Sequence, residues 1–86
     1  MYNIELKPQA AKFIAAQSKK IQRQLIAHIE ALASTPRPAG CKLLYAKENL
    51  YRIRSGNYRI IYQIQDKKLL VVVVKIGDRK EIYRFL

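Results

Sequence analysis

Three arginines flank a tight turn in the second half of the chain and could together bind an anion. Gly56 and Asn57 separate two stretches that alternate apolar and polar residues, and a glycine in first place suits a two-residue type II′ hairpin turn. This turn sets Arg54 opposite Arg59 and leaves both on one face with Arg52. Like charges directly opposite each other on neighbouring strands are destabilising by up to about 1 kcal/mol, so this patch is expected to meet an anion.

Arginine suits that role because its planar guanidinium can bind phosphate oxygens in pairs and can stack on bases. The chain has no acidic residue between Glu48 and Asp66, so no carboxylate near in sequence can neutralise the three arginines. A solvated polar face is the alternative interpretation, but such faces usually mix charges of both signs. The pattern therefore favours a phosphate-binding patch formed by Arg52, Arg54 and Arg59.

A second basic group, Arg79 and Lys80, follows the third strand of the predicted sheet. The turn before it should lie at one end of the sheet, where Arg79 could approach the three arginines. Tyr83 comes four residues after Arg79. Packing is the more common role for a lone tyrosine, and that role stays open beside a functional one.

The chain lacks the usual groups for acid–base chemistry and for metal binding. Cleavage of RNA by its own 2′-hydroxyl needs a base, an acid and stabilisation of a crowded phosphorus centre. The one histidine, His28, lies inside a predicted helix and is interpreted as structural, so proton transfer would fall to Tyr, Lys or Arg. One histidine, one cysteine (Cys41) and scattered acids make no metal site, and no cofactor is expected.

The charge is strongly positive, with 17 Lys and Arg against six Asp and Glu, or +11 in 86 residues. Self-repulsion of this size indicates a polyanionic or acidic partner. The longest apolar run, Leu69–Val74, suits a buried strand and is too short for a membrane span. With no secretory signal and a single cysteine, we expect one domain over residues 1–86, located in the cytoplasm.

The elements that must position these residues follow from periodicity and from turn residues. An N-terminal strand and a hairpin of two helices should pack on an antiparallel sheet meander, which is an α+β fold. The expected elements are a strand over 1–6, a first helix from Pro8, a second helix over Lys19–Ala33 capped by Ser18, strands over Leu50–Arg54, Tyr58–Gln65 and Leu69–Ile76, a break at Gly77-Asp78, and a last short strand over Glu81–Leu86.

Two stretches resemble the motifs of the RelE/ParE toxin superfamily. They are Tyr51–Tyr62, with the sequence YRIRSGNYRIIY, and Ile76–Tyr83, with the sequence IGDRKEIY. The resemblance covers roughly Lys42–Arg84 and implies a RelE-like, microbial ribonuclease-like fold. It also implies the toxin of a type II toxin–antitoxin system, neutralised by an acidic RelB-like antitoxin. A RelE-type member is a metal-independent endoribonuclease that cleaves mRNA in the A site of the 70S ribosome and arrests translation.

The resemblance assigns roles to the residues singled out above. Catalysis would fall on Arg59, Arg79 and Tyr83, and RNA binding on Arg52, Arg54 and Lys80. Arg52 and Arg54 stand where some active members have lysine, and Asp78 stands where relatives often have histidine or a basic residue. Two alternatives remain: a ParE-like inhibitor of DNA gyrase, and a non-catalytic RNA-binding module.

Overall fold

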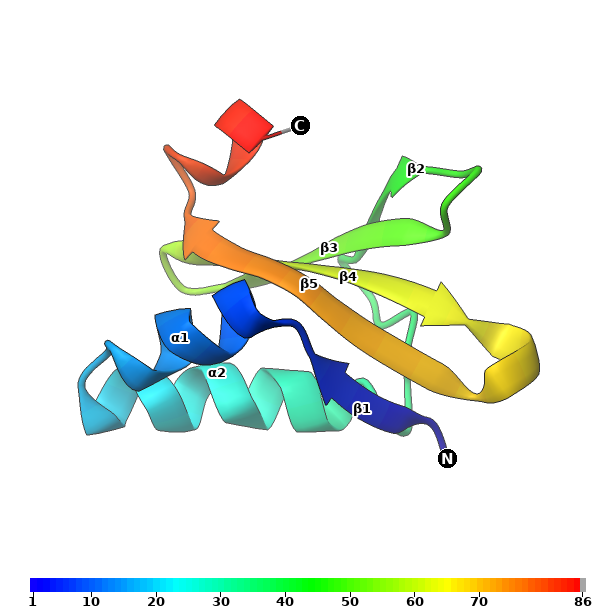
Figure 1. Ribbon diagram of the computed structural model, residues 1–86, viewed down its shortest axis with the longest axis horizontal. Helices are drawn as coiled ribbons and strands as arrows, with labels where there is room; N and C mark the ends of the chain where they lie inside the picture. Colours follow the sequence, from blue (N-terminus) through cyan, green and yellow to red (C-terminus); the bar gives the residue numbers. More distant parts are fainter. Residues whose placement is uncertain (86) are drawn as a thin grey trace.

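The computed structural model describes residues 1–85 and shows two helices packed on one face of a five-stranded sheet (Figure 1). The strand order is β1-β5-β4-β3-β2, in which β1 runs parallel to β5 and all other neighbours are antiparallel. The predicted α+β fold is confirmed, and the N-terminal strand makes the sheet mixed. The elements are β1 (Asn3–Leu6), α1 (Pro8–Ala15), α2 (Lys19–Ala31), β2 (Lys42–Tyr45), β3 (Leu50–Ser55), β4 (Tyr58–Gln65), the 3-10 turn η1 (Asp66–Lys68), β5 (Leu70–Asp78) and the 3-10 turn η2 (Ile82–Phe85).

Both helices begin where the sequence predicts. Pro8 occupies the first turn of α1, where its missing N–H is not needed. At the start of α2 the Ser18 hydroxyl accepts a 3.4 Å hydrogen bond from the backbone N–H of Ile21. The helix ends at Ala31, two residues before the predicted end. Neither helix, and no other helix within residues 1–85, is long and apolar enough to cross a membrane.

The core lies between the helices and the sheet. Tyr62 is fully buried there, stacks on the Tyr51 ring at 5.9 Å between centroids, and donates a 2.7 Å hydrogen bond to the Pro36 carbonyl. Burial raises the pKa of Tyr62, so its hydroxyl stays protonated and remains a donor. The other buried apolar side chains of this core are Ala10, Ile14, Leu25, Ile29, Leu32, Ile53, Ile60, Ile64, Val71, Val73 and Ile76.

The hairpin of β3 and β4 has the predicted register, in which Ser55 pairs with Tyr58 and Arg54 with Arg59. Gly56 has φ +60, as the first position of a type II′ turn requires. A Cβ atom at Gly56 would also lie 2.6 Å from the side-chain nitrogen of Gln24 on α2. The turn therefore lies against the helix, and a larger residue at position 56 would have to displace the flexible end of the Gln24 side chain.

The third strand of the predicted meander is longer and less regular than the sequence suggests. It begins at Leu70 because Leu69 adopts a left-handed conformation with φ +49, and it continues through Gly77 to Asp78. The predicted break at this glycine is therefore wrong. A bulge at Val74 shifts the pairing with β4 by one residue.

The predicted last strand over Glu81–Leu86 is also wrong for the part that the structure describes, and Leu86 lies outside it. Residues 82–85 form η2. Ile82 is buried against β5, with its Cδ1 only 3.0 Å from the position that a Cβ atom on Gly77 would take. Burying Ile82 on the sheet surface folds this segment over the face opposite the helices (Figure 1).

The edge of β5 beyond β1 is closed by a side chain. The amide group of Gln9 on α1 donates a 3.0 Å hydrogen bond to the carbonyl of Ile76 and accepts a 3.0 Å hydrogen bond from its N–H. These two hydrogen bonds to the backbone of Ile76 are of the kind that a neighbouring β-strand would make. The side chain of Gln9 therefore continues the pairing that β1 makes farther along β5.

A small polar network ties the N-terminus to the loop before β2. Asp66 accepts hydrogen bonds from the guanidinium of Arg37 at 2.9 and 3.2 Å and from the hydroxyl of Tyr2 at 2.7 Å. Arg37 also lies 5.2 Å from the centre of the Tyr51 ring. The Arg37 guanidinium holds the pKa of the Asp66 carboxyl at about 2.

This depressed pKa predicts part of the acid sensitivity of the fold. The unfolded chain protonates Asp66 near its ordinary pKa of about 3.9, so its contribution is complete above that pH and is lost as the pH falls to about 2. Between pH 5 and pH 2 we expect the melting temperature to fall less in Asp66→Asn than in the parent chain. Circular dichroism melts at both pH values measure this difference, and an equal loss in the two proteins would contradict it.

Candidate nucleic-acid interface

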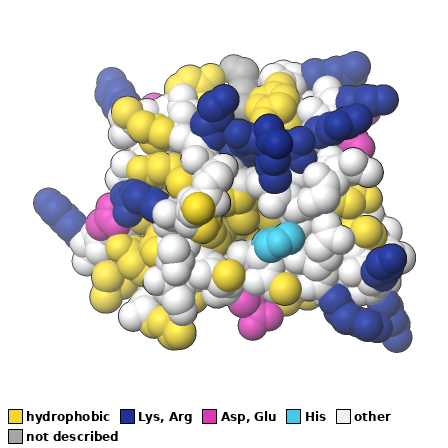
Figure 2. Space-filling model, turned by 180° about the vertical axis from the view of Figure 1, so that it is seen from behind, with side chains coloured by type: hydrophobic (Ala, Val, Ile, Leu, Met, Phe, Trp, Pro, Cys, Tyr) yellow, Lys and Arg dark blue, Asp and Glu magenta, His cyan; other side chains and the backbone are white. Residues whose placement is uncertain are grey.

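The face of the sheet away from the helices gathers positive charge. In strands β2 to β5, alternation and register place no carboxylate among the described residues of this face. Figure 2 shows the densest group of Lys and Arg side chains over the upper part of the molecule, the region that β2, β3 and η2 occupy in Figure 1. We call this surface the cationic face, and its strand cations are Lys42, Arg52, Arg54, Arg59 and Lys75.

Arg52 lies at the centre of β3 and is almost buried. Its Cα pairs with Lys42 on one side and with Ile61 on the other, and the residue is only 6% exposed. Its Nε has no hydrogen-bond partner. Buried charged groups are normally paired, so this guanidinium is held in a costly position that an anion would relieve.

Arg59 lies on the neighbouring strand, directly opposite the exposed Arg54. It is 9% exposed, and its Nη1 donates hydrogen bonds of 3.0 and 2.9 Å to the carbonyls of Gly56 and Tyr58. These carbonyls fix the guanidinium at the turn of the hairpin. The predicted cluster of three arginines is therefore present, with two of its members largely buried rather than solvated.

The segment after β5 is fastened to the same turn. The backbone N–H of Arg79 donates a 2.9 Å hydrogen bond to the carbonyl of Asn57, which places Arg79 beside the end of the hairpin. The Asp78 side chain accepts a 2.8 Å bond from the backbone N–H of Lys80. Asp78 thus stabilises this turn, and the side chains of Arg79 and Lys80 are exposed.

Tyr83 follows on η2 and is 46% exposed. Its position depends on the burial of Ile82 against Gly77, because that contact fixes η2 on the sheet. The structure thus brings Arg54, Arg59 and Arg79 to one end of the hairpin, keeps Arg52 on the same face one pair farther along, and carries Lys80 and Tyr83 on the adjoining segment.

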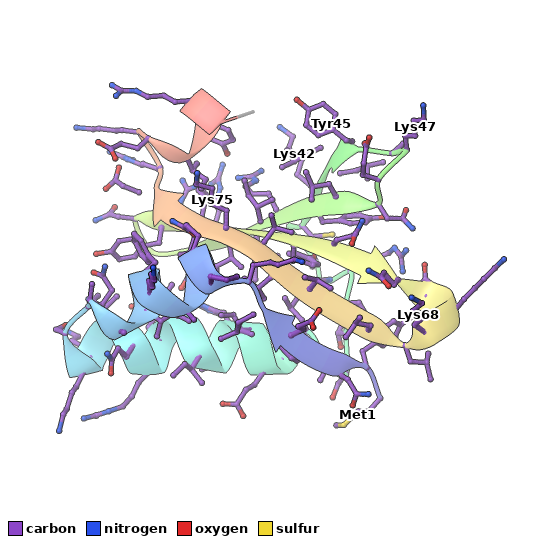
Figure 3. The ribbon with its side chains drawn as sticks, in the orientation of Figure 1. Met1, Lys42, Tyr45, Lys47, Lys68 and Lys75 are labelled. Atoms are coloured by element: carbon purple, nitrogen blue, oxygen red, sulfur yellow. The ribbon has the colours of Figure 1, made fainter. Side chains whose placement is uncertain are left out.

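Two cations of this face were not predicted, namely Lys42 and Lys75. Lys42 pairs with Arg52 from β2, a strand that has no strong alternation in the sequence. Lys75 reaches the face because the bulge at Val74 sets it opposite Ile61. Figure 3 shows both side chains on the side of the sheet away from the helices. The sequence did contain a signal for the bulge that places Lys75. Unbroken alternation after Val73 would have pointed this lysine into the core, which is unfavourable for a charged side chain.

The opposite side of β3 holds the only histidine. His28 Nδ1 lies 2.7 Å from the Ser55 hydroxyl, which also accepts a 3.3 Å hydrogen bond from Gln24. This cluster joins α2 to the hairpin beneath the sheet, away from the cationic face. Within residues 1–85, no group of three or more His, Cys, Asp or Glu side chains could hold a metal ion.

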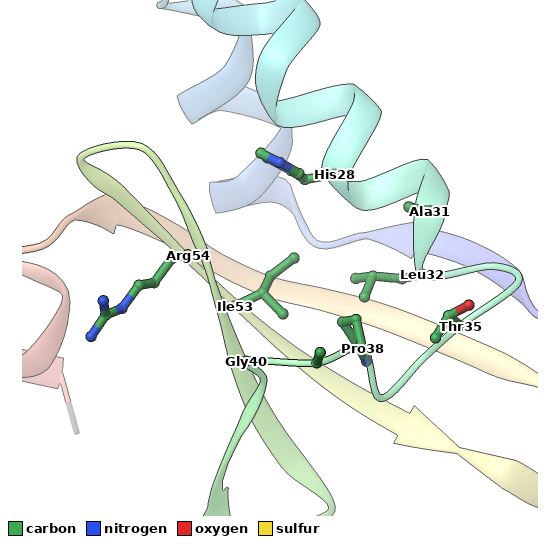
Figure 4. Close-up of a pocket in the computed structure, with 9 residues that line it drawn as sticks. His28, Ala31, Leu32, Thr35, Pro38, Gly40, Ile53 and Arg54 are labelled. Carbon is green, nitrogen blue, oxygen red and sulfur yellow. The ribbon is translucent and has the colours of Figure 1, made fainter.

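A pocket of about 480 Å³ opens beside His28, between the end of α2, the loop before β2 and strand β3. Its lining is mostly apolar. Figure 4 shows Leu32, Pro38 and Ile53 around the pocket, whereas the side chain of Arg54 is directed away from it. Strand β3 therefore separates an apolar pocket from the cationic face.

Comparison with known proteins finds one family over nearly the whole chain. The model of the ParE toxin of the type II toxin–antitoxin system parDE matches residues 4–83. A RelE-like toxin protein of Escherichia coli is 28% identical over 86 residues, which are 95% of this chain and 90% of that protein. The mRNA interferase toxin RelE of Escherichia coli K12 is 29% identical with the same coverage.

Solved structures agree with these relatives. A chain of the intact Escherichia coli RelBE toxin–antitoxin complex superposes with a TM-score of 0.77 and 28% identity, over 91% of this chain and 96% of that chain. A chain of the archaeal RelE-RelB complex from Pyrococcus horikoshii gives 0.84 and 25% identity, over 93% of this chain and 97% of that chain. The fold and the order of its elements are therefore those of the RelE toxins.

The unpartnered Nε of Arg52 leads to a prediction in which stability and RNA binding change in opposite directions. Replacing a buried, poorly paired charge by an apolar residue of similar length often stabilises a protein by about 1 kcal/mol or more. We expect Arg52→Met to raise the melting temperature by about 4–8 °C for each kcal/mol gained, and to weaken binding of a single-stranded oligoribonucleotide. Arg54→Met, at the exposed neighbour on the same face, should leave stability nearly unchanged. Destabilisation by Arg52→Met would contradict the interpretation.

Proposed function

Because the chain belongs to the ParE toxin family of type II toxin–antitoxin systems, we propose that it is a ribosome-dependent mRNA endonuclease of the RelE type. It cleaves the codon in the A site and arrests translation, which makes the cytoplasm its place of action. The Escherichia coli relative named an mRNA interferase supports this assignment. The observation that carries it is the buried guanidinium of Arg52, which lacks a hydrogen-bond partner at Nε and lies on the part of the face, formed by the described residues of β2 to β5, where no carboxylate is found.

The cationic face supplies the binding of RNA. Arg52, Arg54 and Lys80 hold phosphates on either side of the scissile bond, and the fork of each guanidinium can bind two phosphate oxygens at once. Arg52 is already desolvated, so its interaction with a phosphate is stronger than that of a surface lysine. Binding therefore selects a bent, single-stranded backbone that can lie against the sheet.

Cleavage proceeds by attack of the 2′-oxygen on the neighbouring phosphorus. A bond forms between these two atoms, the bond from phosphorus to the 5′-oxygen breaks, and the products carry a 2′,3′-cyclic phosphate and a 5′-hydroxyl. The proton leaves the 2′-hydroxyl for a base, and another is given to the departing 5′-oxygen. Arg59 and Arg79 stabilise the extra negative charge on the phosphorane, and the Tyr83 hydroxyl takes part in proton transfer.

The ribosome has a defined role in this scheme. The cationic face offers no histidine, because His28 lies on the other side of β3. A site with weak proton-transfer groups depends on the alignment of the attacking oxygen, the phosphorus and the leaving oxygen. The A site supplies that alignment by holding the codon in one conformation, and no step of the scheme passes through a metal or another cofactor.

The test is a reconstituted translation reaction with the purified protein, in which primer extension locates new 5′ ends in the mRNA. The parent chain should cut at ribosome-occupied codons. Arg79→Ala should lower the cleavage rate by about 10²–10³-fold, as loss of one stabilising donor does, and Tyr83→Phe by a comparable factor. Lys12→Ala on the helix side is the control and should cut like the parent chain. Intact mRNA with unaffected translation would exclude the nuclease.

A second candidate function follows from the description of the matching family, which names a ParE toxin. Such a toxin would inhibit DNA gyrase by binding. A gyrase supercoiling assay separates the two functions, because the nuclease leaves supercoiling unaffected. A non-catalytic RNA-binding module would instead retain salt-sensitive affinity for RNA without cutting it.

The antitoxin partner is the third part of the proposal. The matched structures from Escherichia coli and Pyrococcus horikoshii are toxin–antitoxin complexes, and the net charge of +11 favours an acidic, RelB-like protein. Its charged residues guide the encounter, and an apolar anchor fills the pocket beside Leu32 and Ile53.

Filling that pocket should block the antitoxin and spare the nuclease. Ala31→Trp places a large ring at the end of α2, where Ala31 lines the pocket (Figure 4). We expect it to lower affinity for the small acidic protein encoded by the adjacent gene at least tenfold in titration calorimetry, while cleavage stays unchanged. The control is Ala27→Trp, one turn earlier on the same helix and outside the pocket lining. Equal affinities of the two variants would remove the pocket from the interface.

A further inference from the structure

Strand β2 contains a bulge that turns one tyrosine toward the cationic face. Lys42 pairs with Arg52 and Leu43 with Tyr51, but the next pair joins Tyr45 to Leu50, so Leu44 is an extra residue in β2. Paired residues of antiparallel strands point to the same side of a sheet. Without the extra residue, Tyr45 would share the face of Leu43. With it, Tyr45 shares the face of Lys42 and Arg52.

The side chain of Tyr45 is partly exposed at that position. It is 44% exposed, nearly the same as the 46% of Tyr83, and it is not among the residues that pack against the core. Figure 3 shows Tyr45 and Lys42 projecting from β2 on the side of the sheet where Lys75 also lies. The cationic face therefore has an accessible aromatic ring at its β2 edge and a second one on η2.

We propose that Tyr45 stacks on a base of the bound codon and contributes to the choice of the codon that is cut. The proposal rests on the RNA-cleaving function proposed above. Successive same-face positions of a strand are about 7 Å apart. A nucleotide spans a similar reach from its phosphate to its base, so a phosphate held by Lys42 and Arg52 brings its base to Tyr45.

Stacking explains why an aromatic residue stands at this exposed place. An aromatic plane accepts the face of any base, and the strength of stacking differs between purines and pyrimidines. Tyr45 therefore acts on affinity and on preference, while the arginines act on the charge of the backbone. The bulge supplies the orientation, as bulges do where a side chain must be aimed at a site.

The strand itself provides a matched control. Leu43 lies two residues before Tyr45, is 49% exposed, and pairs with Tyr51 on the opposite face. Loss of packing in β2 would make Leu43→Ala and Tyr45→Ala similarly defective. Loss of a stacking ring would affect only Tyr45→Ala and would be rescued by Tyr45→Phe.

The experiment uses 70S ribosomes programmed with mRNAs that differ in one A-site base. Tyr45→Ala should lower kcat/KM about tenfold or more, by different factors for a purine and a pyrimidine at one codon position, whereas Tyr45→Phe and Leu43→Ala stay within twofold of the parent chain. An mRNA with 2-aminopurine and a 2′-O-methyl block in that codon reports stacking without cleavage. Its fluorescence should be quenched by the parent chain and by Tyr45→Phe, but not by Tyr45→Ala.

The outcomes separate this inference from the function on which it rests. If the parent chain cuts and Tyr45→Ala cuts equally well with equal quenching, the stacking role is wrong and the nuclease stands. If the parent chain leaves every mRNA intact, the nuclease is wrong. Affinity for a free single-stranded oligoribonucleotide then decides the role of Tyr45, because equal binding by the parent chain and Tyr45→Ala would overturn it.

Discussion

The constraint on which this structure depends is the separation of charge from apolar surface across a single sheet. The sheet carries five cations on its strands, with no carboxylate among them. If both faces of the sheet were buried, the cost of removing these unpaired charges from water would destabilise the fold. Both α-helices therefore lie on one side, and in β3 Arg52 and Arg54 alternate with Tyr51 and Ile53, which face the helices. Where alternation fails, as at Lys75, a bulge restores it by moving the lysine out of the core and returning Ile76 to it.

The same constraint explains why the candidate site is costly to maintain. Arg52 is buried with an unpartnered Nε, and Arg59 uses turn carbonyls in place of an acidic partner. An acid beside either residue would stabilise the free protein but would occupy the place of a phosphate. The proposed site is therefore arranged for a phosphate in advance, so phosphate binding would need little reorganisation. Functional sites commonly hold groups in positions that the isolated fold does not favour.

The sequence was most informative where a local signal fixed geometry. Gly56 determined the hairpin turn, the turn determined the register, and the register placed Arg54 opposite Arg59. The bulges at Leu44 and Val74 escaped prediction because each depends on the neighbouring strand, and with them Lys42, Lys75 and Tyr45 were missed. The C-terminal segment was predicted as a strand from its alternation alone. That prediction could not take into account that Gly77, which has no side chain, leaves room for Ile82 to pack on β5, where the segment forms a 3-10 turn.

One side chain on α1 also limits how copies of this chain can associate. The free edge of a strand is a template on which another chain can add a strand. The Gln9 amide saturates the backbone of Ile76 at the point where β1 no longer covers β5. A strand from another copy could pair with β5 at Ile76 only after these two hydrogen bonds are broken, so this point of the edge opposes strand addition between copies of the chain.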